Sequence, residues 1–124
     1  MVNFGYEYIV DVIECNEKYI HDLENIKNFV DDLIERVGMN KLGEIKYEYV
    51  NEEMANKAGQ PDIVGYSVCQ FIITSKKTVH FCNVSKKIYF NLFSCSYFDR
   101  AVVKLLLLKY FNGFIHSDQF ITRF

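Results

Sequence analysis

Alternation of apolar and polar residues recurs along the chain and constrains its fold more than any other feature of the sequence. In the first such segment, Tyr8, Val10 and Val12 alternate with Glu7 and Asp11, which is typical of a strand with one buried face. The same pattern predicts six strands, over residues 4–15, 45–50, 65–74, 78–84, 88–94 and 114–123.

A long helical segment follows the first strand. Apolar residues recur at intervals of three and four between Glu17 and Val37, which is the period of an amphipathic helix. Asn16 is placed as an N-cap and Gly38 as a C-terminal stop. One helix of about five turns is therefore predicted.

A second helix is predicted near the C-terminus. Ser96 and Asp99 have the spacing of a capping box, which marks the start of a helix. This helix is expected to run from about Tyr97 to Phe111, with Gly113 ending it.

The order of these elements indicates the fold class. Residues 51–61 are polar and end in the only proline, so we interpret them as a surface loop. The remaining order is strand, helix, four strands, helix, strand. It predicts an α+β fold, a two-layer sandwich whose largely antiparallel sheet carries both helices on one face. Because 124 residues match the length of one domain, residues 1–124 are expected to form a single domain.

Charge and hydropathy exclude several classes of partner. A net charge of −2 offers no attraction to nucleic acid. The longest apolar run, Val102–Leu108, contains Lys104 and is far shorter than the roughly 20 residues of a membrane span. Residues 1–7 lack the pattern of a secretory signal, so we expect a soluble, cytoplasmic protein that binds neither nucleic acid nor membrane. The lysine pairs at 76–77 and 86–87 flank one strand and are interpreted as a solvated hairpin edge.

The cysteines and histidines form no local metal motif. The four cysteines are scattered without a C-x-x-C pair, so free thiols are expected at Cys15, Cys69, Cys82 and Cys95. The three histidines are too far apart in sequence to suggest a metal site, and no metal is predicted: they are His21, His80 and His116.

One spacing in the second half of the chain does carry information about chemistry. Ser67 ends a Gly-Tyr-Ser segment, Ser75 follows eight residues later, His80 five after that, and Cys95 fifteen further on. This spacing resembles the S-adenosylmethionine decarboxylase proenzymes of the short bacterial and archaeal type. The resemblance extends over most of the chain, because the order of strands and helices also matches in place.

The resemblance implies a pyruvoyl cofactor made from the chain itself. In that family a serine attacks the preceding carbonyl, the resulting ester undergoes β-elimination, and the dehydroalanine left behind hydrolyses to a pyruvoyl group with loss of ammonia. Here Ser75 would attack the carbonyl of Thr74, so the chain would be cut between these residues. Ser67 would stabilise the intermediate of the acyl shift, and His80 would remove the proton that triggers elimination. The pyruvoyl group would then bind the substrate amine as a Schiff base, and Cys95 would return a proton to the substrate carbon.

The chain departs from the family pattern at two places. The family has Glu-Ser-His at the cleavage point, whereas this chain has Thr, Ser and Lys at positions 74–76. The family's Trp-Pro-Glu corresponds to Cys, Asn and Val at positions 82–84, so Val84 replaces the glutamate that binds the substrate ribose. Tyr49 matches the aromatic residue that stacks on adenine.

These departures leave the substrate open. The acids Glu52, Glu53 and Asp62 are candidates to bind either the ribose or the distal group of a basic amino acid. The sequence therefore predicts a pyruvoyl-dependent decarboxylase of polyamine metabolism that acts on S-adenosylmethionine or on ornithine or arginine. By resemblance it would be a homodimer with active sites near the subunit interface. The alternative is a non-processing homologue that binds S-adenosylmethionine or a conjugate of it, as a lyase or a regulatory subunit.

Overall fold

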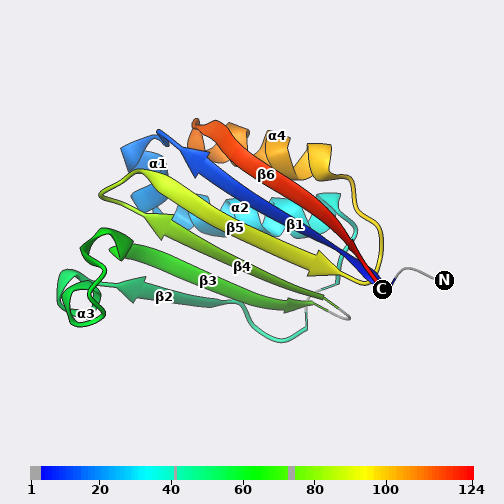
Figure 1. Cartoon of the computed structure of the whole chain (residues 1–124), viewed down its shortest axis with the longest axis horizontal. Coiled ribbons are helices and arrows are strands. Elements are labelled where there is room, and N and C mark those ends of the chain that lie inside the picture. The colour runs from blue at the N-terminus through cyan, green and yellow to red at the C-terminus, as the bar shows by residue number, and fades with distance from the viewer. Residues whose placement is uncertain (1–3, 41, 73–74) are drawn as a thin grey trace.

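A single six-stranded antiparallel sheet organises the protein, whose computed structural model describes residues 4–40, 42–72 and 75–124 (Figure 1). Neighbouring strands follow the order β2-β3-β4-β5-β1-β6. The strands are β1 (Gly5–Ile13), β2 (Lys46–Val50), β3 (Gly65–Ile72), β4 (Ser75–Cys82), β5 (Lys87–Ser94) and β6 (Phe114–Arg123). The described part of the sheet thus matches the six predicted strands, although residues 73 and 74 of the third lie outside it.

The two longer helices, α2 (Leu23–Arg36) and α4 (Arg100–Phe111), cover one face of this sheet (Figure 1). Their apolar sides meet the alternate strand residues that point toward them, and Phe29 of α2 lies in T-shaped contact with Phe90 of the sheet and Phe111 of α4. Burial of this aromatic cluster is a main source of stability for the two-layer arrangement. The predicted α+β sandwich with two helices on one face is confirmed.

The predicted long helix after β1 is wrong in one respect, because it is broken into α1 (Glu17–His21) and α2. Asp22 has an extended backbone, with φ −89° and ψ 107°, and its side chain accepts a hydrogen bond from the Glu24 amide. Asp22 therefore acts as an N-cap for a new helix. Asn16 caps α1 as predicted, so each of two capping residues starts its own helix.

The segment interpreted as a surface loop is also partly helical. Asn51 accepts a hydrogen bond from the amide of Met54 and caps α3 (Glu52–Lys57). A short 3-10 helix, η1 (Pro61–Ile63), follows it. The polar composition of residues 51–61 correctly predicted that the segment is largely exposed. It did not indicate that Asn51 would act as the N-cap of a helix.

The last helix ends at Phe111 as predicted, but it begins at another residue than predicted. Asp99 is itself the N-cap, accepting from the Ala101 amide, so α4 starts at Arg100 rather than near Tyr97. The residue that caps its C-terminus is Asn112, which adopts the left-handed conformation with φ 50°, rather than the predicted Gly113. Gly113 has another role, because a Cβ there would lie 2.6 Å from the backbone oxygen of Ile13.

The interpretation of residues 76–77 as a solvated hairpin edge is wrong for Lys77. Strand β4 lies inside the sheet, between β3 and β5, and alternation along it leaves Lys76 exposed while Lys77 is fully buried. A one-residue step in a strand moves a side chain to the other face. Among the described residues, no helix is long and apolar enough to cross a membrane.

Candidate functional site

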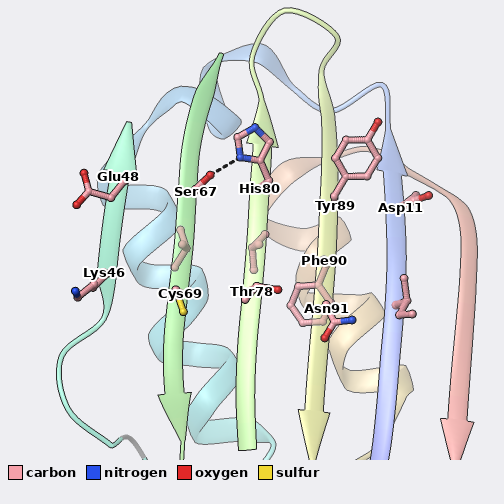
Figure 2. Close-up of a pocket in the computed structure, with 13 residues that line it drawn as sticks. Asp11, Lys46, Glu48, Ser67, Cys69, Thr78, His80, Tyr89, Phe90 and Asn91 are labelled. Carbon is pink, nitrogen blue, oxygen red and sulfur yellow. Dashed lines mark hydrogen bonds between the residues drawn. The ribbon is translucent and has the colours of Figure 1, made fainter. Parts of the chain in front are cut away.

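The open face of the sheet, opposite the helices, presents a hydrogen-bonded serine and histidine. Ser67 of β3 and His80 of β4 are direct partners across the two strands, and Ser67 Oγ lies 2.5 Å from His80 Nδ1 (Figure 2). His80 Nε2 lies 2.8 Å from the carbonyl oxygen of Ile63. A carbonyl can only accept, so Nε2 carries the hydrogen in neutral His80 and Nδ1 accepts from the Ser67 hydroxyl.

A shallow cavity of about 630 Å³ surrounds this pair on the open face. Charged side chains of both signs lie around it, namely Asp11 on β1 and Lys46 and Glu48 on β2 (Figure 2). Tyr89 of β5 lies beside His80 and is 46% exposed. This face thus offers a general base with a fixed tautomer in an environment that water and a second molecule can reach.

A second pocket, of about 440 Å³, lies between α1, the end of β2 and the turn after β4. It contains both predicted substrate-binding residues, Tyr49 and Val84. Asn83 bridges the pocket, because its Nδ2 lies 2.6 Å from His21 Nδ1 and 3.4 Å from the Tyr49 hydroxyl. The structure therefore brings two distant predicted residues together and adds His21 and Asn83, which the sequence analysis missed.

The acids that were candidates for the substrate's polar groups do not line this pocket. Glu52 and Glu53 lie on α3, where Glu53 forms an exposed ion pair with Lys57 at 3.4 Å. The described residues that line the pocket include instead Glu17 and Lys18, from the first turn of α1. No local motif marks this placement, because it depends on the break between α1 and α2.

Ser75 lies at the opposite end of the sheet from the Ser67–His80 pair. It is the first residue of β4 and pairs with Ser94 of β5, and Cys95 follows directly. Five residues separate Ser75 from His80, which corresponds to about 17 Å along a strand. The structure therefore brings Ser67 and His80 together, and places Ser75 and the neighbourhood of Cys95 elsewhere in the same chain.

The surroundings of Ser75 combine aromatic and cationic groups. Ser75 borders a pocket of about 350 Å³ that also includes Phe71, Lys76, Phe93 and Arg123. Alternation along β4 directs the Ser75 side chain to the face of Lys77, while Phe93 and Arg123 belong to the open face. Thr74, the other residue of the predicted cleavage point, lies outside the described residues.

The four cysteines are free thiols and differ in reactivity. Burial raises the pKa of Cys15 to about 12, and burial also raises the pKa of Cys82. Both are therefore held in the unreactive thiol form at neutral pH. Cys69 and Cys95 are half-buried and are the more accessible thiols. Within the part of the chain that the structure describes, no group of three potential ligands is arranged to hold a metal ion.

Comparison with known proteins identifies the family to which the chain belongs. The family model described as S-adenosylmethionine decarboxylase matches residues 6–123, which is nearly the whole chain. No curated protein sequence matches. Members of the matching family are pyruvoyl-dependent decarboxylases. The chain therefore belongs to the S-adenosylmethionine decarboxylase family.

Proposed function

We propose that this protein is a self-processing, pyruvoyl-dependent decarboxylase of polyamine metabolism that acts as a homodimer. The observation that carries the proposal is the hydrogen bond between Ser67 Oγ and His80 Nδ1. This bond joins two residues that are thirteen positions apart in the sequence. The family resemblance assigns both of them to the same processing reaction. The tautomer of His80 leaves Nδ1 as the basic atom, which is what proton removal requires.

The residues around Ser75 fit a pyruvoyl group only if a second chain takes part. Within one chain, His80 is about 17 Å from Ser75 along β4 and projects from the other face. The sheet, however, carries its long helices on one face (Figure 1). The open face holds Ser67 and His80 near one end and the pocket beside Ser75 at the other. A copy related by a two-fold axis and laid head to tail on this face would bring the pocket beside Ser75 of one chain toward His80 of the other. The Ser75 side chain, which lies on the helix-covered face, would have to turn to the open face for these groups to meet.

Each half of such a composite site has a distinct task. A pyruvoyl group at position 75 would supply a ketone that withdraws electrons as carbon dioxide leaves. During processing, Ser67 would turn its one hydroxyl hydrogen from His80 Nδ1 to the developing oxyanion, which frees Nδ1 to accept the proton from the α-carbon of residue 75. Cys95, next to the pairing partner of Ser75, would return a proton to the substrate carbon.

The substrate is proposed to be S-adenosylmethionine, with ornithine or arginine as the alternatives that the loss of a carboxylate at Val84 suggests. The non-processing homologue is the second candidate function. It is favoured by one observation, the separation of Ser75 from His80 within a chain. In that case the protein would stay uncut and would bind its ligand without releasing carbon dioxide.

Release of carbon dioxide tests the proposal. Purified protein is incubated separately with S-adenosylmethionine, ornithine and arginine, each labelled in its carboxyl carbon. One of the three should release labelled carbon dioxide, and Cys95→Ala should lose most of this turnover. Cys15→Ala is the control, because Cys15 is also a free thiol but is buried after the end of β1 and is held in the unreactive form, and the folded variant should keep its activity. Absence of release from all three substrates would overturn the proposed decarboxylase.

A further inference from the structure

A fully buried lysine lies on the helix-covered face of the sheet, close to Ser75. Lys77 is the second residue after Ser75 on β4 and is 0% exposed. Apart from tyrosine and cysteine, the described residues include two other buried polar ones. They are Gln70, which pairs with Lys77, and Ser94, which pairs with Ser75. We infer that Lys77 is the base that takes the proton from the Ser75 hydroxyl in the first step of processing, an inference that rests on the proposed function and assigns a residue to that step.

The position of Lys77 along β4 places its amine within reach of Ser75. Alternate residues of a strand project to the same face, and two residues span about 7 Å. A lysine carries its amine on a flexible four-carbon stem, which is long enough to bring Lys77 Nζ to the Ser75 hydroxyl. His80, the base of the later step, lies with Ser67 on the open face. It therefore does not face this hydroxyl while Ser75 points toward the helices.

The surroundings of Lys77 suit a base. Burial removes the water that hydrates an ammonium group, which favours the neutral amine, the form whose lone pair accepts a proton. The strand partner Gln70 is also fully buried, and its Nε2 donates to the Phe71 carbonyl oxygen at 2.8 Å. Gln70 Oε1 is buried and has no hydrogen-bond partner among the described residues. This oxygen is available to accept a hydrogen bond from the ammonium that forms when Lys77 takes the proton.

The proton that Lys77 takes is returned within the same step. Lys77 Nζ accepts it as Ser75 Oγ bonds to the carbonyl carbon of residue 74. The bond from that carbon to the Ser75 nitrogen then breaks, and the Lys77 ammonium gives the proton to this leaving nitrogen. An ester now joins the two parts of the chain, and Lys77 is neutral again. The later elimination uses His80, so the two steps of processing use bases that belong to opposite faces of the sheet.

Trapping of the ester with hydroxylamine tests the inference. All chains carry His80→Ala, which blocks elimination so that the ester accumulates, and they are compared with and without Lys77→Met. Methionine is unbranched and apolar and fits a buried site, but it is not a base. Hydroxylamine cleaves the ester, and mass spectrometry follows the release of residues 1–74 and 75–124. We expect Lys77→Met to slow this release by about 100-fold, a typical contribution of general base catalysis.

Two further variants guard against a change in folding. Lys77→Gln keeps a polar end but supplies no base, and it should slow the release as much as Lys77→Met does. Lys87→Met is the matched control, because Lys87 is also a strand lysine but pairs with Cys82 at the other end of β4, and it should leave the release unchanged. Circular dichroism identifies the variants that are folded.

A change of nucleophile separates a base from a structural role. Ser75→Cys supplies a thiol, which loses its proton far more readily than a hydroxyl and needs less help from a base. Lys77→Met should therefore slow the release by less than tenfold when it is combined with Ser75→Cys. A defect in the shape of the strand would slow the reaction of both nucleophiles alike.

The outcomes separate this inference from the proposed function. Release that is equally fast with and without Lys77 in folded chains overturns the role of Lys77, and so does equal slowing of the two nucleophiles. If the wild type is cut in either case, self-processing stands and only the base is rejected. A protein that is not cut as wild type and gives no trapped ester as His80→Ala overturns both the inference and the proposed self-processing.

Discussion

Two variants that are each unable to process should restore cleavage to one another if the site is shared between two chains. His80→Ala keeps Ser75 but lacks the base, and Ser75→Ala keeps the base but lacks the residue that is processed. In a mixed dimer, one of the two composite sites combines the intact Ser75 of the first chain with the intact Ser67–His80 pair of the second. Only the His80→Ala chain can then be cut.

The expected magnitude follows from the geometry and from random pairing. Because His80 and Ser75 are separated by about 17 Å within a chain, His80 should contribute nothing to cleavage of its own chain. Equal amounts of the two variants should pair at random, so about half of the His80→Ala chains should meet a Ser75→Ala partner and be cut. Either variant alone should stay full length.

The assay is co-expression of differently tagged chains, followed by electrophoresis and mass spectrometry. The matched control replaces the Ser75→Ala partner with the double variant Ser75→Ala/His80→Ala, which supplies no base and should leave the tagged chain intact. The reasoning is refuted if His80→Ala is cut when it is expressed alone. It is also refuted if the wild type is cut while no cleavage occurs in the mixed dimers.

Two predictions concern stability. Gly65 has φ +144°, and a Cβ there would lie 1.8 Å from the Phe81 carbonyl oxygen, so Gly65→Ala should lower the free energy of unfolding by roughly 2–4 kcal/mol in denaturant titration. Gly43 also has a positive φ, of +76° in the left-handed region, but no neighbour within 4 Å, so Gly43→Ala should cost only about 1 kcal/mol; equal losses in the two variants would show that the close approach to Phe81 is unimportant. Asp118 accepts a hydrogen bond from the Tyr8 hydroxyl at 2.7 Å and pairs with Lys104 at 3.1 Å, which hold the pKa of its carboxyl below the usual 3.8. The stabilisation that the Asp118 carboxylate contributes is complete above pH 3.8 and is lost as the pH falls through its lower pKa in the folded protein. Asp118→Asn should therefore lower Tm at pH 7 and match the wild type in strong acid. A difference in Tm that does not change with pH would contradict this assignment.

The strands could be predicted from the sequence because alternation depends on local residues and on burial of one face. Strand β6 runs from Phe114 to Arg123 as expected, since its flanking residues end the helix before it. Helix boundaries were harder to predict, because several residues can serve as caps. Asp22 and Asp99 each begin a helix. Which of several candidate capping residues begins a helix depends on which side of the helix must pack against the sheet, rather than on the capping motif itself.

The candidate site could be predicted only in part. Pairing of Ser67 with His80 follows from the antiparallel register of β3 and β4, so their spacing carried real information. The same register places Ser75 at the far end of β4 from His80, a consequence that a list of spacings does not show. Glu17, His21 and Asn83 were missed because they meet only through the path of α1 across the end of the sheet.

The central claim is that Ser75 becomes the cofactor of this enzyme, and the intact mass of the purified wild-type protein tests it most directly. After incubation at neutral pH, we expect two fragments, residues 1–74 and residues 75–124, with the second carrying a pyruvoyl group in place of its N-terminal serine. Ser75→Ala should give one species of full length under the same conditions. A wild-type chain that keeps its full mass of 14.6 kDa after long incubation would contradict the account.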